Sequence, residues 1–529
     1  MTVHPFQVAC NRHQGDAVDL HVASSYSIHI THDVSDTDTT ASLDKYPAKQ
    51  HARNVASRLS DPCGLIYLKG QQTRLREDSD MEVEFNQRRY FSYMSGVSEP
   101  DCALLYNIEN DSLTLYVPDF DFKKAIWTGS TLTPDDAMVK YNFDEVKYAS
   151  SLENDLREWA GVTTSLASCS SEPTPTLYAL HKSHLPPVDD VLQKVAVDTL
   201  SLVPAMNAAR TIKDDHEISL IKKAIAVSTA GHIAVLRNIP RMKNEREIHG
   251  LFLDTCISLG SFRQSYGIIA GSGANAAILH YMSNDDTLEG KELVLLDAGA
   301  EWNVYASDIT RTFPRFGVWP SQESKDIYAL VQKMQEECIS RIRPGVRFLD
   351  LQVMAHSIAI EGLLRLGIIK AQGSGATVEE IRKAGVSAVF FPHGLGHHVG
   401  LEVHDVSDRP TNAAAVAASM EYPDTHPDMF PSTSQPATLL APLLAEGMVV
   451  TVEPGIYFSR VAIEFSKKGQ AAKYIDYDVL EKYMRVGGVR IEDDILVTKN
   501  GYENLTHTPK GEKALTIIRE AMRERKEIA

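Results

Sequence analysis

The chain has 529 residues, of which 43% are hydrophobic and 23% charged, and its formal net charge is −17 at pH 7. A chain of this length exceeds what one hydrophobic core usually supports, so two domains are the first expectation. The acidic balance argues against nucleic acid or an anionic membrane as a partner, because both bind clustered Lys and Arg. A small-molecule or peptide substrate is compatible with this composition.

The cysteine pattern and the apolar stretches favour an intracellular protein. The six cysteines lie far apart and include no Cys-x-x-Cys pair, which is typical of reduced thiols. The first ten residues contain no Lys or Arg, and Asp16 and Asp19 follow, unlike a secretory or transit peptide. The strongly apolar stretch from Ala224 to Leu236 is too short to span a bilayer. We therefore expect a cytoplasmic protein with no membrane partner.

The first part of the chain predicts a polar extension and a mixed domain. Residues 1–44 are rich in Ser, Thr, Asp and His, which predicts a poorly ordered extension or one marginal strand. Residues 45–205 follow as an amino-terminal domain in which strand-like and helical runs alternate, and this pattern indicates a mixed sheet with helices. The predicted strands are 64–68, 103–106 and 113–117, and the predicted helices are 48–59 and 134–140.

A second domain is predicted over residues 206–515, after a boundary between Pro204 and Asp214. Asp214 with Glu217, and Asn244 with Glu247, form two capping-box patterns that each begin a helix. Helices are also expected at 321–342 and 349–366, a Pro- and Ser-rich surface insertion at 411–442, and a charged helix end at 516–529.

Five short motifs in the second domain carry acidic or imidazole groups between strand-like runs. They are Leu295–Gly299, Ala306–Thr312, His393–His397 (His-Gly-Leu-Gly-His), Thr451–Gly455 and Arg490–Asp494. Taken singly, each motif is an ordinary strand end. Together their carboxylates could offset two divalent cations, with one imidazole completing the ligand set: Asp297, Asp308, Glu453, Glu492 and His397. Oxygen-rich ligation without a thiolate favours hard cations such as Mn²⁺.

Local geometry supports the clustering of these groups. Asp297 ends the apolar run 293–296, and Asp308 is expected in the next strand. A hairpin of that length can bring both carboxylates to one place, one bridging two ions and one chelating a single ion. Arg490 and Glu492 are two residues apart on a predicted strand, so they share a face, and the guanidinium can orient neighbouring carboxylates. The alternative for Arg490 is an ordinary surface cation.

The order and spacing of these motifs resemble the creatinase/methionine aminopeptidase family of pita-bread metallopeptidases, most closely its prolidase and aminopeptidase P branch. The resemblance runs from about Tyr46 to Thr508. It implies an α+β fold, with a pita-bread domain at 206–515 after a smaller creatinase-type domain at 45–205. An aromatic run with the residues after it resembles the start of that smaller domain: Arg88, Tyr90, Phe91, Tyr93, Gly96 and Glu99-Pro100. By itself this run is equally compatible with an ordinary aromatic-rich strand.

The resemblance also implies roles for side chains around the ions. Glu453 is both a ligand and the group that moves a proton from the attacking water to the leaving amine. Arg490 orients the carboxylates. Three histidines, His280, His393 and His404, are substrate-side imidazoles that donate hydrogen bonds to the substrate carbonyl and the oxyanion. Each could instead be a structural histidine, and the family pattern gives His398 no role.

The expected activity is that of an Xaa-Pro aminopeptidase with two divalent ions, a homodimer acting on peptides with proline in the second position. Dedicated prolidases carry a basic residue shortly before the Gly-Met-Val strand, where it holds the carboxylate of an Xaa-Pro dipeptide. Residues 438–448 contain no Arg or Lys here, although Arg409 or Arg460 could substitute. The alternatives are an Xaa-Pro dipeptidase of the same mechanism and a catalytically silent pita-bread binding protein.

Overall fold

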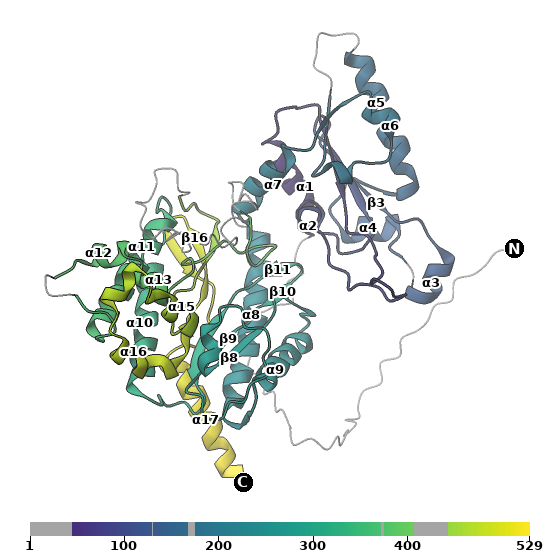
Figure 1. Cartoon of the computed structure of the whole chain (residues 1–529). Coiled ribbons are helices and arrows are strands. Elements are labelled where there is room, and N and C mark those ends of the chain that lie inside the picture. The colour runs from purple at the N-terminus through teal and green to yellow at the C-terminus, as the bar shows by residue number, and fades with distance from the viewer. Residues whose placement is uncertain (1–44, 130, 168–174, 372–374, 407–442, 529) are drawn as a thin grey trace. The chain divides into compact units, whose positions relative to one another are not determined.

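The computed structural model describes residues 45–129, 131–167, 175–371, 375–406 and 443–528 (Figure 1). The extension predicted at 1–44 and the insertion predicted at 411–442 lie outside the described residues.

A six-stranded mixed sheet forms the centre of the amino-terminal part, in the order β4-β3-β2-β1-β5-β6. β1, β2 and β3 pair antiparallel, and the outer neighbours pair parallel. The middle strands are buried along nearly their whole length, as expected for a sheet covered on both faces. The strands are β1 (Leu65–Lys69), β2 (Ala103–Asn107), β3 (Ser112–Val117), β4 (Glu145–Tyr148), β5 (Thr176–Tyr178) and β6 (Ala196–Asp198).

Helices cover this sheet. They are α1 (Ala48–Ala56), α2 (Arg89–Ser95), α3 (Phe122–Thr128), α4 (Pro134–Lys140), α5 (Leu152–Ala167), α6 (Asp189–Leu192) and α7 (Leu202–Thr211), with 3-10 turns η1 (Ala149–Ser151) and η2 (Lys182–His184). The strand interpretation of the aromatic run is wrong, because it forms α2. All residues from Phe91 to Ser95 are buried, and Gly96 ends the helix in the left-handed conformation with φ 65°. Seven residues are too few to display a helical period in the sequence.

The junction with the second domain is helical. α7 occupies the stretch in which the boundary was expected, and α8 (Asp215–Asn238) begins with the predicted capping box of Asp214 and Glu217. Residues 215–241 are long and apolar enough to cross a membrane by length and composition, and 50% of the apolar 18-residue window within them is buried inside the protein. Two of its buried polar side chains bond other elements, since Ser228 bonds Ser307 and Nε2 of His232 bonds the Ala298 carbonyl. α8 therefore packs against other elements of the second domain, among them α9 and α17.

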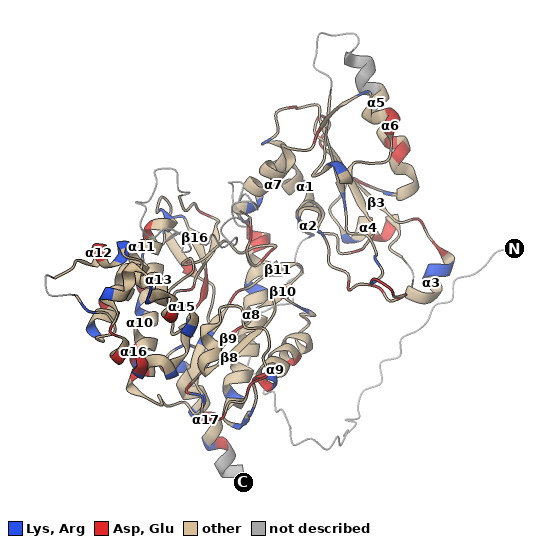
Figure 2. Ribbon diagram, in the orientation of Figure 1, with Lys and Arg blue, Asp and Glu red and all other residues tan. Residues whose placement is uncertain are grey.

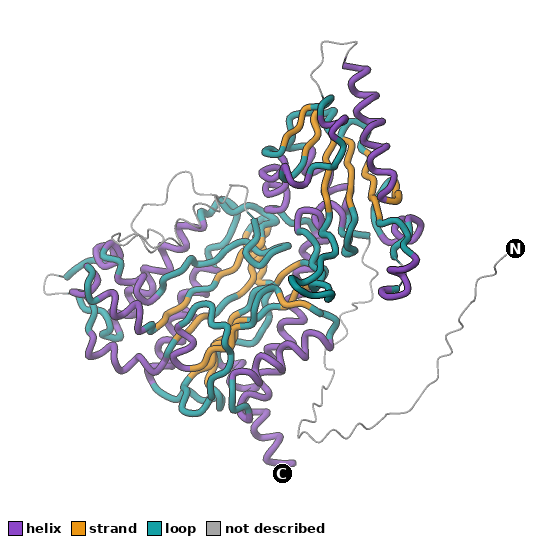
Figure 3. The backbone as a smooth tube through the Cα atoms, turned by 45° about the vertical axis from the view of Figure 1, so that its right-hand side comes forward, coloured by secondary structure: helices purple, strands orange, loops and turns teal. Residues whose placement is uncertain are grey.

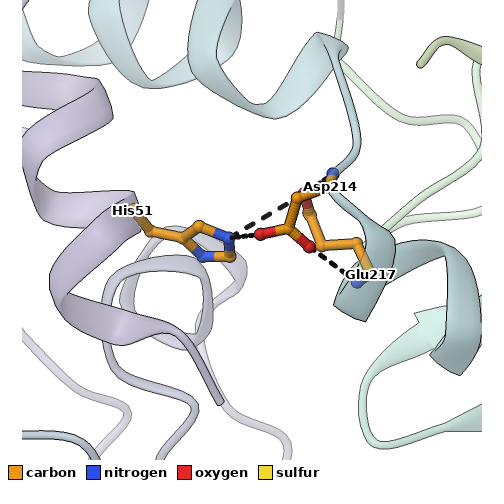
Figure 4. A group of neighbouring side chains, drawn as sticks. All are labelled: His51, Asp214 and Glu217. Carbon is orange, nitrogen blue, oxygen red and sulfur yellow. Dashed lines mark hydrogen bonds and ion pairs between the residues drawn. The ribbon is translucent and has the colours of Figure 1, made fainter.

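His51 of α1 contacts the capping box of α8 (Figure 4). Its Nε2 lies 2.9 Å from Oδ2 of Asp214, and its Nδ1 lies 2.7 Å from the Tyr93 carbonyl. The four carboxylate oxygens of Asp214 and Glu217 all accept hydrogen bonds, from His51, from the two backbone N–H groups of the box and from the Tyr305 hydroxyl. The geometry of the three side chains would suit a cation, but these protein donors already satisfy the oxygens.

The second domain is built from small antiparallel sheets with helices outside them (Figure 3). The sheet orders are β12-β9-β8, β11-β10-β7, β13-β16-β17 and β14-β15. Strands and helices are segregated rather than alternating, which agrees with the predicted α+β class. Acidic and basic residues are interspersed over the helices (Figure 2). The strands are β7 (Arg263–Gln264), β8 (Ile269–Ser272), β9 (Leu293–Asp297), β10 (Ala300–Trp302), β11 (Tyr305–Ala306), β12 (Thr310–Pro314), β13 (Val449–Val452), β14 (Gly455–Tyr457), β15 (Gly488–Arg490), β16 (Asp493–Thr498) and β17 (Gly501–Asn504).

The helices of this domain include the four predicted ones, with ends shifted by a few residues. Besides α8 they are α9 (Glu245–Ser258), α10 (Gln322–Ile339), α11 (Phe348–Arg365), α12 (Val378–Lys383), α13 (Val386–Phe390), α15 (Arg460–Ser466), α16 (Tyr477–Tyr483) and α17 (Glu512–Ile528). The 3-10 turns are η3 (Ile239–Arg241), η4 (Gly273–Ala277), η6 (Gln470–Tyr474) and η7 (Met484–Val486). A large apolar cluster packs α10, α11 and α13 against β13 to β16 and so supports the strands that carry the motifs.

Candidate active site

A cavity of about 630 Å³ lies in the second domain, and all nine side chains predicted for the site line it. They are Asp297, Asp308, His397, Glu453, Glu492, His280, His393, His404 and Arg490. The remaining wall is largely apolar, with Ile269, Leu279, Met282 and Val403. The cavity therefore combines a polar floor of carboxylates and imidazoles with a wall suited to apolar side chains.

Asp297 and Asp308 come together through the pairing of β9 with β12. Asp297 is the last residue of β9 and pairs with Thr310 of β12, two residues after Asp308. Asp308 lies just before β12 rather than within it, because the short strands β10 and β11 intervene and join β7 in another sheet. Its backbone N–H donates to Asp494 at 3.0 Å, which fixes the bend. Both residues are at most 7% exposed.

His397 and Glu453 are held by the contact of two extended segments. The backbone N–H groups of Thr451 and Glu453 donate to the carbonyls of His397 and Leu395. A Cβ on Gly396 would lie 2.1 Å from the Thr451 carbonyl, so only glycine permits this approach. The Nδ1 of His397 lies 3.0 Å from the His398 carbonyl, which leaves Nε2 facing Asp308 at 3.4 Å and Glu453 at 3.3 Å.

Arg490 and Glu492 enter the cavity from the end of β15. Arg490 is its last residue, while Glu492 lies between β15 and β16, so the single continuous strand predicted there is wrong. Both side chains nevertheless reach the site. The guanidinium of Arg490 donates to Asp297 at 2.5 Å, and Glu492 accepts from Thr310 at 2.6 Å. Arg490 is 4% exposed, which excludes the surface-cation alternative.

The three further histidines differ in how they are held. His393 is fully engaged, with Nδ1 at 2.8 Å from the Gly394 carbonyl and Nε2 at 2.8 Å from the Tyr457 hydroxyl. His404 packs edge-on against His397, with ring centroids 4.3 Å apart. His280 is exposed at the cavity wall. His398 does not line the cavity, and burial with the charge of Lys213 lowers its pKa to about 4.

The electrostatics of the cavity floor are dominated by crowded carboxylates. Burial raises the pKa of Asp308 to about 6, and the charges of Asp297 and Glu453 act in the same direction. Burial and the charges of Asp308, Glu453 and Asp297 raise the pKa of Glu492 well above its ordinary value. For Glu453, burial is outweighed by the hydrogen bond and charge of His397, and its pKa falls to about 2.

The donor set fits divalent cations. Single donor atoms of Asp308, His397 and Glu492 lie within 4.8 Å of one another. Oδ1 of Asp297 is buried and accepts no hydrogen bond in the described structure. The His397 arrangement, with Nδ1 bonded to a carbonyl and Nε2 directed at carboxylates, is that of a metal-ligating histidine. Four carboxylates beside one guanidinium and one imidazole leave an excess of negative charge that divalent cations would offset.

Sequence reasoning missed the side chains that support the site. Thr310 accepts from Arg490 at 3.1 Å and donates to Glu492, and Tyr457 accepts from Arg490 at 2.9 Å. Thr451 accepts from the His397 N–H at 3.0 Å. Thr310 could have been predicted from the sequence, because it is two residues after Asp308 and so shares its face on an extended chain. Tyr457 and Thr451 carry no comparable signal in the sequence.

Comparisons with known proteins agree with this geometry. Residues 219–499 match the model of metallopeptidase family M24, and residues 48–166 match that of the aminopeptidase P amino-terminal domain. A probable Xaa-Pro aminopeptidase of Aspergillus clavatus is 55% identical over 95% of this chain and 96% of its own. One from Aspergillus fumigatus is 57% identical over 90% of this chain and 93% of its own.

Solved structures give the same result. Aminopeptidase P from E. coli with the inhibitor Pro-Leu superposes with a TM-score of 0.71 at 26% identity, over 91% of this chain and all of that one. The zinc-substituted E. coli enzyme in complex with product superposes with a TM-score of 0.70 at 26% identity, over 90% of this chain and 99% of that one.

Proposed function

The chain belongs to metallopeptidase family M24, in its aminopeptidase P branch, and we propose that it is an Xaa-Pro aminopeptidase. The reaction is hydrolysis of the bond between an amino-terminal residue and a following proline. The observation that carries the proposal is the convergence of five metal-donor side chains on one cavity, in a chain more than half identical to curated probable Xaa-Pro aminopeptidases.

The enzyme uses divalent metal ions, and we assign two of them to Asp297, Asp308, His397, Glu453 and Glu492. Mn²⁺ is the proposed ion, because the donors are oxygen-rich with one nitrogen and no thiolate. When bound, such ions polarise the scissile carbonyl and lower the pKa of an attacking water.

The chain's own residues handle protons and orientation. Glu453 is placed to take the water's proton and pass it to the leaving amine, since its carboxylate faces the same space as Asp308 and His397. Arg490 holds Asp297 in orientation through its Nη2 donor. His280, His393 and His404 surround the space for the substrate carbonyl and oxyanion, where donated hydrogen bonds are worth most in the transition state.

Peptides longer than two residues are the proposed substrates. A dipeptide's free carboxylate would require a cation, and burying it unpaired costs on the order of 2 to 5 kcal/mol. Among the described residues lining the cavity, Arg490 is the one Lys or Arg side chain, and it is already paired with Asp297. Arg460 is exposed at the start of α15 and does not line the cavity, while Arg409 lies outside the described residues.

We further propose a cytoplasmic homodimer. Helix α3 buries none of its residues, and Phe122, Ile126 and Trp127 are 70%, 68% and 88% exposed, an apolar surface of the kind that subunit contacts cover. The cytoplasm is consistent with the buried free thiols of Cys102, Cys256 and Cys338.

The catalytically silent alternative is not favoured, because all five predicted metal-donor side chains are present.

Turnover of matched peptides tests the function. After chelation and reloading with Mn²⁺, the enzyme should cleave Xaa-Pro-Yaa with a kcat/KM at least about tenfold above that for Xaa-Pro or Xaa-Ala-Yaa. A preference for the dipeptide would indicate an Xaa-Pro dipeptidase. Absence of turnover in a preparation shown to contain the metal would overturn the proposal.

A further inference from the structure

Three buried charged residues lie behind the active-site loop that carries His404. The carboxylate of Asp405, the next residue, accepts from Nη2 of Arg210 at 2.6 Å and from Nζ of Lys213 at 3.1 Å. All three side chains are at most 2% exposed. A buried ion pair of this kind is costly to form, and removing one partner is strongly destabilising because it leaves an uncompensated buried charge.

The two cations belong to the segment that joins the two domains. Arg210 is in the last turn of α7, and Lys213 directly precedes Asp214, the N-cap residue of α8. The guanidinium of Arg210 also lies over the ring of Tyr90 in α2, 4.8 Å from its centroid. Asp405 therefore ties the loop that carries His404 to the junction of α7 and α8 rather than to another loop.

The backbone around Asp405 leaves room for its buried carboxylate. The backbone N–H of Asp405 donates to the His398 carbonyl at 2.9 Å, and the same carbonyl accepts from Nδ1 of His397. A Cβ on Gly400 would lie 2.2 Å from Oδ2 of Asp405, so glycine leaves the space that the carboxylate fills. The ring of His404 then rests edge-on against His397.

We propose that Asp405, held by Arg210 and Lys213, is a positioning residue that fixes the His404 imidazole over the cavity. Asp405 does not line the cavity, and it acts through the neighbouring His404. The inference rests on the proposed function, since it assumes that His404 contacts the substrate or its oxyanion. A group used in the transition state must be held before the reaction, because reorganisation at that moment would raise the barrier.

A double-mutant cycle tests the proposal on the Mn²⁺-loaded enzyme with an Xaa-Pro-Yaa peptide. Asp405→Asn with Lys213→Met removes one charge of each sign, so that no new buried net charge is created. This pair should lower kcat by roughly tenfold or more with little change in KM, the effect of a residue that orients a reacting group. In a His404→Ala background the same pair should cost less than about twofold, because the two changes remove one function.

The controls separate positioning from stability. Arg210→Lys keeps a cation and should retain more activity than Arg210→Met. Lys147→Met removes an ion-pair partner of Asp155 in the amino-terminal domain and should leave kcat unchanged. Hydrogen exchange measured on residues 398–406 should accelerate in the Asp405 pair and not in Lys147→Met, and this readout does not depend on turnover.

Three other outcomes would each contradict the positioning role of Asp405. If the losses from the Asp405 pair and from His404→Ala multiply fully, Asp405 acts independently of His404 and the positioning role is overturned. If His404→Ala retains full activity, both the positioning role and the assignment of His404 are wrong, while wild-type turnover still reports the peptidase function. If exchange over residues 398–406 does not change, the anchor does not hold the loop, whatever the activity shows.

Discussion

Arg490 and Asp297, 193 residues apart in the chain, meet through a 2.5 Å hydrogen bond from Nη2 to Oδ2. The same guanidinium donates from Nε to Thr310 and from Nη1 to Tyr457. Burial lowers the pKa of Arg490, but the surrounding Tyr457, Asp297, Glu492 and Glu453 outweigh it and hold the pKa well above its ordinary value. The guanidinium is therefore a fixed cation that orients one metal-donor carboxylate.

Replacing Arg490 should impair the reaction without abolishing it. Arg490→Ala is expected to lower kcat/KM by about 10 to 100-fold, the usual cost of losing a residue that orients a metal ligand. Arg490→Lys should recover little, because a single ammonium cannot reproduce three directed N–H bonds. Steady-state kinetics on Xaa-Pro-Yaa peptides check this. Full activity of the lysine variant would show that charge alone suffices.

Removing Asp308 should have a larger effect. Asp308→Ala deletes a donor that lies 3.4 Å from His397 and shares the cluster with Glu492, so an ion there would lose a ligand. We expect turnover below detection, with thermal unfolding close to that of the wild type. Metal content measured by elemental analysis should fall together with activity. Normal turnover, in a preparation shown to be free of wild-type enzyme, would contradict the metal assignment.

Gly396 offers a test of the backbone contact that holds His397. Gly396→Ala would place a methyl group 2.1 Å from the Thr451 carbonyl, which must then move away. Because the Thr451 and Glu453 N–H groups bond the same segment, the movement should displace both His397 and Glu453. We expect a loss of more than tenfold in kcat/KM and a lower melting temperature. Gly394→Ala is the matched control, since its nearest contact is 3.8 Å away.

The sequence indicated which residues line the cavity better than it indicated the elements that carry them. Asp297 ends an apolar strand and Glu453 follows one, so local pattern located both within the fold. The same pattern placed Asp308 inside the next strand, whereas Asp308 precedes β12. The strands β10 and β11 lie between β9 and β12, and they are too short to show a clear alternation of apolar and polar residues. The hydrogen bonds of Arg490 with Tyr457 and Thr310 arise from tertiary packing, so no periodic pattern in the sequence predicts them.

The same limit explains α2. Its buried residues run without a break from Phe91 to Ser95 and include two serines, so no single apolar face stands out. A short, mostly apolar run of this kind has the same pattern in a buried strand and in a buried helix. By contrast, the start of α8 was predictable, because a capping box needs only two residues three positions apart, here Asp214 and Glu217.

His51 gives a prediction of pH-dependent stability away from the metal donors. Burial lowers its pKa, but the hydrogen bond with Asp214 and the charges of Glu217 and Asp214 outweigh it, so the pKa lies above 6.5. Burial raises the pKa of Asp214, but the bonds from His51 and the Glu217 N–H lower it below 3.8. Tyr46 and Tyr93 also face the ring, and burial raises both of their pKa values, so they stay neutral at ordinary pH.

The sign follows from these directions. A raised histidine pKa contributes stability that is complete below about pH 6.5, the unfolded value, and is lost as pH rises through the folded value. The free energy of unfolding of the wild type should exceed that of His51→Gln by about 1 to 2 kcal/mol near pH 6, with the difference shrinking toward pH 8.5. Urea unfolding followed by circular dichroism measures it. Asp214→Asn keeps a helix-capping side chain and should remove most of the pH dependence. A difference that stays constant from pH 6 to 9 would mean that His51 stabilises the contact by packing rather than by charge.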